Sequence, residues 1–340
     1  MKTVLLLVPL LLQDTKVQSD VEVRPLAGEI QVWRHRSRKT EKPPGPVVVS
    51  PEDRIGALGE TVARIALDGD VVLVLKGVEA KPEAGLSAQR LGQKLLLKLY
   101  KGSAVVESLE TEVAVETPHG KAEGKAAYFL LEVTREKSRI VAIDGSLTYT
   151  TRLGQVTLEA GESLTADGKK APVRGGDAAD PSWASTPGNV VENPSFELGF
   201  TDWEVAEVDG RKLAAIDDKL ARSGTKSARI DLPVPSKRWL LFEAHYGSLA
   251  PGTRQMFRAW VRAENFAGDV SISFQFMRKD QQIPDSAIAK KFTVKPGAWT
   301  CLRFFLTPPG DGYEMCVLPG EAAGGTLWFD DFFLAPLPAR

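Results

Sequence analysis

The sequence contains few of the residues on which many metal and catalytic sites depend. Only 2 cysteines and 3 histidines occur among 340 residues. Cys301 and Cys316 have no close histidine partners, which argues against a zinc site. They lie in neighbouring strand-like segments, where a disulfide and two buried thiols are both compatible with the sequence. The sequence therefore leaves the state of this cysteine pair open.

Motifs of common enzyme classes are also missing. No histidine lies in a Gly-x-Ser-x-Gly or His-Glu-x-x-His context, and no phosphate-binding glycine loop follows a predicted strand. A glycosidase needs two carboxylates on either side of a cleft. Glu243 with Asp280 or Asp285 is such a pair, but a chain with 44 acidic residues offers many. The sequence thus predicts a protein that is not an enzyme.

The chain lacks an excess of charge of either sign. Its formal net charge is −1, and the densest basic stretch, residues 34–39, precedes a proline-rich loop and fits a solvated face. Binding of a polyanion through bulk charge is therefore not expected. We predict no nucleic-acid partner.

Long apolar runs are absent too. No segment reaches the 18 apolar residues expected of a membrane-spanning helix. The run Val4–Leu12, which follows Lys2, has the length of a signal-peptide core, with cleavage near Ser19. The alternative is a buried first strand. We predict a signal peptide over residues 1–19, a periplasmic or secreted protein, and no membrane span once that peptide is removed.

What the sequence does contain is many short β segments. Long amphipathic helices are scarce, while 30 glycines and 22 prolines recur along the chain as turn residues. A stretch rich in Gly, Ala, Asp, Ser and Pro, residues 174–188, reads as a linker. We predict an all-β protein: a β-sandwich or roll over residues 25–173, and a β-sandwich jelly roll over residues 189–336.

The first half resembles the FecR-type periplasmic domain over roughly residues 55–170. The matching segments are the strand-Gly-strand at 97–106, VETPHGKAEG at 115–124, AYFLLEV, AIDGSLTYTT and VTLEAGESL. The sequence departs from the family at Lys125, where a threonine is usual, and has two extra residues before Phe129. The resemblance implies an extracytoplasmic domain that acts as a scaffold or sensor and contacts envelope proteins.

The second half resembles the CenC-type carbohydrate-binding modules, which are galactose-binding-like jelly rolls. The shared features are NPSFE at 193–197, SG-x-K-S-A at 223–228, L-x-PGT at 249–253, the tryptophan of PGAWT at 296–300, and WFDDF at 328–332. They occur in family order. The resemblance implies a module that binds polysaccharide or a cell-envelope glycan.

The segment WFDDFFL at 328–334 places two carboxylates inside an apolar strand. Strict alternation directs Trp328, Asp330, Phe332 and Leu334 to one face and Phe329, Asp331 and Phe333 to the other. In the CenC-type family a structural calcium is held by an early Glu and a late Asp. The resemblance therefore implies Ca²⁺ at Glu197 and Asp330 or Asp331, a hard cation with oxygen ligands. The alternative is that both aspartates lie at a strand end and accept hydrogen bonds from backbone amides.

Strand alternation also predicts a polar second face on the jelly roll. Leu240, Phe242 and Ala244 are expected in the core, as are Phe257, Ala259 and Val261 of the next strand and Ile272, Phe274 and Phe276 of the third. The opposite face then offers tryptophans for stacking and polar groups for hydroxyls. The predicted sugar-binding residues are Trp239, Glu243, His245, Arg258, Trp260 and Gln275. The alternative is that the tryptophans cap a core and Arg258 pairs with Glu243 across strands.

These observations predict an exported, non-catalytic carbohydrate-binding protein with a FecR-like scaffold or sensor domain. The alternative function is a structural or protein-interaction scaffold of the envelope without a sugar ligand.

Overall fold

The computed structural model describes residues 18–58, 61–68, 71–81, 85–108, 111–175, 189–208, 211–232, 240–245, 249–266, 268–319 and 324–337. These residues are strands and turns without a helix, so the predicted all-β class is confirmed. In the same residues no helix has the length and apolarity needed to cross a membrane. Most of the predicted signal peptide and linker lies outside the described residues. Gln18–Ser19 (β1) pairs with strand β9, and Val173–Gly175 (β19) is a strand.

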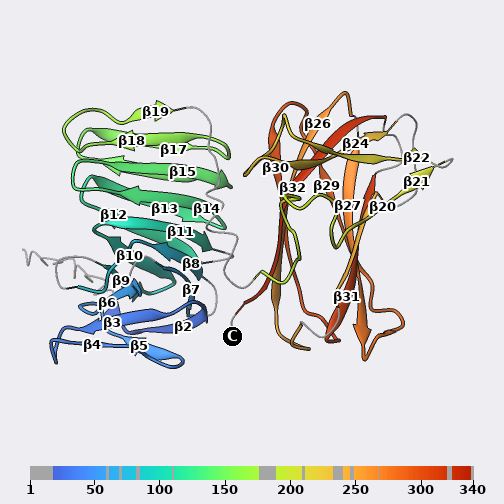
Figure 1. Cartoon of the computed structure of the whole chain (residues 1–340). Coiled ribbons are helices and arrows are strands. Elements are labelled where there is room, and N and C mark those ends of the chain that lie inside the picture. The colour runs from blue at the N-terminus through green and yellow to red at the C-terminus, as the bar shows by residue number, and fades with distance from the viewer. Residues whose placement is uncertain are drawn as a thin grey trace, which may run out of the picture.

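The N-terminal unit, residues 18–175, consists of two sheets stacked face to face (Figure 1). We call them the N-outer and N-contact sheets. The order of the N-outer sheet is β17 (Gly154–Leu158), β16 (Leu147–Thr151), β13 (Gly120–Lys125), β12 (Glu112–Thr117), β10 (Lys94–Leu99), β9 (Leu86–Leu91), β6 (Arg54–Ala57), β3 (Ile30–Arg34) and β4 (Lys39–Glu41), with β1 beside β9. The order of the N-contact sheet is β19, β18 (Ser163–Ala166), β15 (Ser138–Asp144), β14 (Tyr128–Val133), β11 (Gly102–Ser108), β8 (Val71–Lys76), β7 (Val62–Leu67), β2 (Val21–Ala27) and β5 (Val47–Val49).

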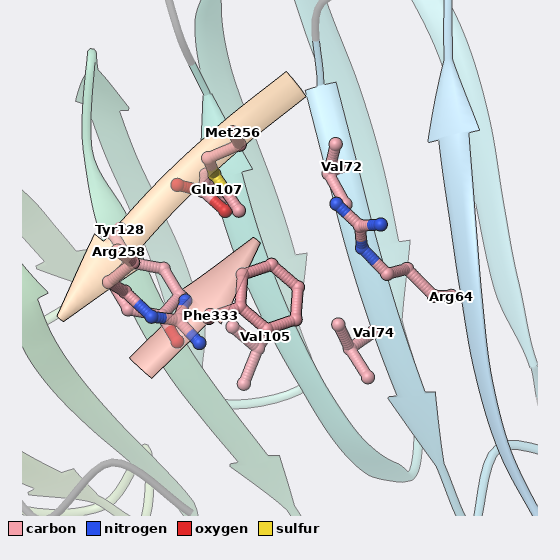
Figure 2. Close-up of a pocket in the computed structure, with 9 residues that line it drawn as sticks. All are labelled: Arg64, Val72, Val74, Val105, Glu107, Tyr128, Met256, Arg258 and Phe333. Carbon is pink, nitrogen blue, oxygen red and sulfur yellow. The ribbon is translucent and has the colours of Figure 1, made fainter. Parts of the chain in front are cut away.

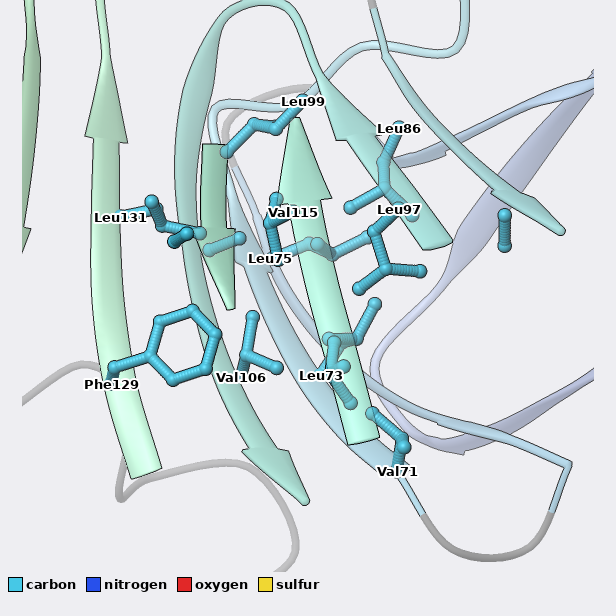
Figure 3. Close-up of a cluster of buried hydrophobic side chains, with 14 of the residues drawn as sticks. Val71, Leu73, Leu75, Leu86, Leu97, Leu99, Val106, Val115, Phe129 and Leu131 are labelled. Carbon is cyan, nitrogen blue, oxygen red and sulfur yellow. The ribbon is translucent and has the colours of Figure 1, made fainter. Parts of the chain in front are cut away.

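One apolar core fills the space between these two sheets. Leu73 and Leu75 of β8 meet Leu97 of β10 there, and Phe129 of β14 is fully buried beside them (Figure 3). Val72 and Val74, the alternate residues of β8, are also buried but belong to two other clusters. A strand that is apolar at every position is buried on both faces. The N-contact sheet therefore has a second apolar surface.

The C-terminal unit, residues 189–337, is a two-sheet sandwich with a core of its own. Its C-outer sheet has the order β20 (Glu204–Val205), β25 (Leu241–His245), β31 (Gly312–Pro319), β27 (Asp269–Arg278) and β28 (Gln281–Gln282), with β29 (Ile288–Thr293) also paired to β27. Its C-contact sheet has the order β23 (Ala214–Asp217), β24 (Ser227–Leu232), β32 (Gly325–Pro336), β26 (Gln255–Glu264) and β30 (Trp299–Leu306). A small hairpin joins β21 (Glu207–Val208) and β22 (Arg211–Lys212).

Strand β32, which contains WFDDFFL, does not alternate as the sequence predicts. Asp331 has a left-handed backbone with φ of 51°, and the register between β26 and β32 shifts beside it. An extra residue at a β-bulge reverses the faces of everything that follows. Phe329 and Phe332 therefore both enter the core, although strict alternation assigns them to opposite faces. The prediction of one face for residues 328, 330, 332 and 334 is wrong for this reason.

Strands β26 and β27 follow their predicted alternation. Phe257, Ala259 and Val261 of β26 lie in the core, as do Ile272, Phe274 and Phe276 of β27. The outward residues of β26 therefore point away from the jelly-roll core, toward the N-terminal unit, which lies beside the C-contact sheet (Figure 1).

Candidate functional site

Apolar side chains pack the two contact sheets together. Trp260 of β26 joins a cluster that contains Tyr128 and Leu130 of β14. Phe333 of β32 and Met256 join a second cluster with Val72. Each cluster draws residues from both units, so the outer face of the C-contact sheet is an internal surface of this protein.

An arginine of β30 forms the ionic part of this contact. Arg303 Nη1 lies 3.2 Å from Glu107 Oε1, and its Nη2 lies 3.0 Å from Asp144 Oδ2. Arg303 Nη2 also donates to the carbonyl oxygen of Ala126 at 3.1 Å. Burial acts to lower the pKa of Arg303, but Glu107 and Asp144 outweigh it and raise that pKa above its ordinary value. This guanidinium is charged and paired.

Two further arginines are enclosed at the same contact (Figure 2). The Phe333 ring lies between them, with its centroid 5.2 Å from Cζ of Arg64 and 4.8 Å from Cζ of Arg258. They line a cavity of about 10 Å³, the space of roughly one water molecule. Arg64 donates to the carbonyl oxygen of Pro336 at 3.1 Å, and burial lowers its pKa to about 10. Such a cavity holds no ligand larger than water.

A larger groove opens elsewhere along the contact, and we call it the interdomain groove. Its volume is about 540 Å³, within the range of small-molecule sites. The N-terminal unit contributes Asp144, and the C-terminal unit contributes the aromatic and charged walls. The side chains that matter for binding are Asp144, Arg222, Trp260, Arg262, Lys295 and Trp299.

Within the groove, Arg222 lies over the face of Trp260. Cζ of Arg222 is 4.0 Å from the ring centroid, which is within the range of a cation–π interaction. Trp260 is only 4% exposed. Trp260 therefore supports an arginine, and the half-buried Trp299 supplies the aromatic wall that a ligand can reach.

Of the predicted sugar-binding residues, Arg258 and Trp260 point away from the jelly-roll core as expected. The expectation that they form an open face is wrong, since the N-terminal unit covers both. Arg258 lies 2% exposed, with Cζ 4.6 Å from the Tyr128 ring centroid. Of these two residues, Trp260 borders the interdomain groove and Arg258 does not.

Glu243 and His245 lie together on β25, but not on an outward face. Glu243 is 1% exposed, and Tyr313 Oη donates to its Oε1 at 3.1 Å. His245 stacks on the Tyr313 ring, and its Nδ1 lies 3.6 Å from Glu192 Oε1. Burial, followed by the nearby charge of Glu192, raises the pKa of Glu243 to about 7. The predicted alternation of this strand is wrong, because Leu241 rather than Phe242 is the core residue.

Gln275 is held in place by its own unit. Its Nε2 donates to the carbonyl oxygen of Ile283 and to Ser286 Oγ, both at 2.8 Å. It lies on the C-outer sheet, opposite the sheet that carries Trp260. Trp239 lies outside the described residues. The structure thus does not bring the five described residues of this set to one surface, and the role of all six in sugar binding stays a prediction.

The predicted calcium ligands each have local hydrogen-bond donors. Asp330 Oδ2 accepts from the backbone N–H groups of Arg222, at 2.7 Å, and Ser223, at 3.2 Å; its Oδ1 accepts from the N–H of Asp331 at 2.8 Å. Ser223 Oγ donates to Asp331 Oδ1 at 2.6 Å. Burial, followed by the adjacent Asp331, raises the pKa of Asp330 to about 8.

Glu197 is bound by the same turn. Its Oε1 accepts from the N–H groups of Thr225, at 2.8 Å, and Lys226, at 3.0 Å. The turn therefore directs amides, rather than the carbonyls a cation needs, at the carboxylates. No group of three His, Cys, Asp or Glu in the described ranges is placed to hold a metal ion. The residues as arranged do not fit Ca²⁺, and calcium at Glu197, Asp330 and Asp331 stays a prediction.

The two cysteines lie on different sheets and, in the described chain, are not disulfide-bonded to each other. Cys301 is on β30 of the C-contact sheet, and Cys316 is on β31 of the C-outer sheet. Burial raises the pKa of the Cys316 thiol.

Sequence reasoning missed Trp299 and Arg222 as site residues. Trp299 was recognised only as part of the PGAWT signature, and Arg222 precedes the SG-x-K-S-A turn. The apolar runs of β8 and β14 were an available signal that another surface covers the N-contact sheet. Nothing in the sequence says which residues of the second unit provide that cover.

Comparisons with known proteins give structural neighbours alone. No family model and no curated protein matches the chain. Similar solved structures include a family 16 carbohydrate-binding module, with 18% identity and a TM-score of 0.33 over 43% of this chain and 99% of that one. A second is the module TmCBM61 in complex with β-1,4-galactotriose, with 18% identity and a TM-score of 0.32 over 44% of this chain and 98% of that one. A third is the arabinose-bound α-L-arabinofuranosidase MgGH51, with 15% identity and a TM-score of 0.35 over 44% of this chain and 26% of that one. At these TM-scores we take no functional argument from them.

Proposed function

We propose that the protein is an exported, non-catalytic protein that binds a glycan in the interdomain groove. The observation that carries the proposal is the combination of Trp299 with Arg222, Arg262 and Asp144 around one groove. Sugars present C–H faces that stack on aromatic rings and hydroxyls that pair with charged side chains. The proposed export rests on the residue pattern at the start of the chain.

The N-terminal unit is part of this binding site. Asp144 comes from β15, while Arg222, Trp260 and Trp299 come from the C-terminal unit. The Arg303 bridge ties Asp144 to the C-terminal unit at this groove. The FecR-like unit would then act as half of a binding site as well as a scaffold.

The test is affinity electrophoresis of the full chain through gels that contain different polysaccharides. We expect one glycan to retard the wild type and Trp299→Ala to reduce that retardation at least tenfold. Trp33→Ala is the matched control, since Trp33 is a half-buried tryptophan on β3 and does not line the groove. A folded chain that no polysaccharide retards would contradict the proposal.

A second candidate function is an envelope scaffold that binds proteins and no sugar. The observation that favours it is the burial of Arg258 and Trp260 between the two units. A face that packs against the other unit stabilises the protein and does not require a ligand. Envelope extracts passed over the immobilised chain, beside the polysaccharide gels, separate the two functions: specific protein capture without glycan retardation supports the scaffold.

A further inference from the structure

The charged residues that line the interdomain groove are mainly positive. Arg222, Arg262 and Lys295 border it, against the single carboxylate of Asp144. Asp144 is already paired with Arg303: the Oδ2 atom of Asp144 lies 3.0 Å from Nη2 of Arg303, whose side chain is 12% exposed. The three cations therefore face the groove without a matching anion on its walls, although the whole chain has a net charge of −1.

The arginines of the groove also retain unused hydrogen-bond donors. Among the described residues, Arg222 Nη2, Arg262 Nε and Trp260 Nε1 are shielded from solvent and have no hydrogen-bond partner. Arg262 has one acidic neighbour, Glu264, with Nη2 3.7 Å from Oε1 on an exposed side chain. A shielded donor without an acceptor is unfavourable, and an acceptor that reaches it recovers that free energy.

Arg222 is held in position from both sides. Its backbone N–H donates to the buried Asp330 at 2.7 Å, and its guanidinium lies over Trp260, with Cζ 4.0 Å from the ring centroid. A planar guanidinium held in this way is pre-organised for a planar acceptor, since its donors match the two oxygens of a carboxylate. A neutral sugar lacks such a group.

We propose that the groove selects acidic saccharides, with the carboxylate of a uronic acid on Arg222 and Arg262 and the C–H face of the sugar ring against Trp299. This inference rests on the proposed function, because it names the class of glycan that the same groove binds. Lys295 attracts the carboxylate of the next uronic acid unit along the saccharide.

The experiment compares two ligands that differ in whether their carboxylates are free or methyl-esterified. The full chain is titrated calorimetrically, in about 0.15 M salt, with oligogalacturonate and with the same oligomer carrying methyl esters on its carboxylates. At this ionic strength weak surface attraction is screened beyond roughly 8 Å. We expect the free acid to bind about tenfold more tightly than the ester, the order of one charge-assisted contact.

Two variants assign the effect to the groove. Arg222→Gln and Arg262→Gln should each remove the preference for the free acid, and Arg262→Gln serves if the first variant does not fold. Arg229→Gln is the matched control: Arg229 lies on β24 over Trp328 and does not line the groove, so the preference should remain.

The outcomes separate this inference from the function on which it rests. Equal binding of acid and ester, with loss in Trp299→Ala, overturns the acidic preference and keeps glycan binding. Binding of dextran sulfate and DNA as tight as that of oligogalacturonate, unchanged in Arg222→Gln, indicates nonspecific polyanion binding and overturns the inference. Failure of every acidic and neutral glycan to bind the folded chain contradicts both proposals.

Discussion

The guanidinium of Arg303 lies 3.2 Å from the carboxylate of Glu107, a residue 196 positions earlier in the chain. This pair joins the N-contact sheet to the C-contact sheet; Glu107 is buried, and the Arg303 side chain is 12% exposed. Because the apolar clusters beside it also draw on both units, the pair is part of a packed interface rather than an isolated surface bridge.

Arg303→Met is expected to weaken the contact between the units. The change leaves Glu107 buried without its cation, and breaking a buried pair costs about 3 kcal/mol. Urea denaturation should show this loss of unfolding free energy. Arg139→Met is the control, since Arg139 pairs with Glu132 at 2.8 Å on an exposed surface and should cost under about 1 kcal/mol. Equal losses in the two variants would argue against a buried interface.

Arg64→Met is expected to change the free energy of unfolding little. In the described residues Arg64 forms no salt bridge, and its Nη2 has no hydrogen-bond partner. Replacing a poorly compensated buried charge with an apolar side chain of similar length is often neutral or stabilising. We expect the urea midpoint of Arg64→Met to equal or exceed that of the wild type. A loss as large as that of Arg303→Met would show that the Pro336 hydrogen bond and the Phe333 contact matter more than the cost of burial.

Glu243 should make stability depend on pH. Its pKa is about 7 in the folded chain against 4.5 for an ordinary glutamate, because burial favours the neutral acid. Its contribution is therefore fully present below about pH 4.5 and is lost as the pH rises through about 7. The loss is at most roughly 3 kcal/mol.

Glu243→Gln isolates this contribution. Gln stays neutral at every pH. Between pH 5 and pH 8 the variant should therefore lose less unfolding free energy than the wild type. Other groups titrate in both proteins and cancel in this comparison. Parallel pH profiles of the two proteins would mean that Glu243 is ionised in the fold throughout this range.

Asp330→Asn should destabilise the C-terminal unit. The carboxylate accepts three backbone N–H groups, and an asparagine places an amide N–H against one or more of them. An unsatisfied buried donor costs about 1–3 kcal/mol. Asp231→Asn, on an exposed side chain, should change the thermal midpoint little. A midpoint for Asp330→Asn equal to that of the control would contradict the buried network.

Calcium removal tests whether Glu197 and Asp330 bind Ca²⁺ instead of backbone amides. Since amides rather than carbonyls surround Glu197 and Asp330, we expect EDTA and added CaCl₂ to give the same melting temperature. A rise with CaCl₂ that Glu197→Gln abolishes would establish the calcium site predicted from the sequence resemblance. The turn at residues 222–226 would then have to present carbonyl oxygens in the loaded protein.

Alternation predicted the faces of β26 and β27 because both strands keep a regular two-residue period over ten residues. It failed on β32, where the bulge at Asp331 inserts one residue, and on β25, where Glu243 lies inside the sandwich beside Tyr313. A bulge and a buried carboxyl both depend on partners that are distant in sequence. Arg222 and Ser223, which satisfy Asp330, are more than 100 residues away from it.

The sequence by itself determined the all-β class, the apolar strands and, on β26 and β27, the residues that point away from the jelly-roll core, since these follow from a local period of two. Only the tertiary structure decided what those outward residues meet. The two contact sheets pack because each has a second apolar surface that would otherwise face water. This packing buries Arg258 and Trp260 and places Asp144 and Trp299 around one groove. Such a meeting of surfaces depends on shape and charge across the whole fold, and no local pattern records it.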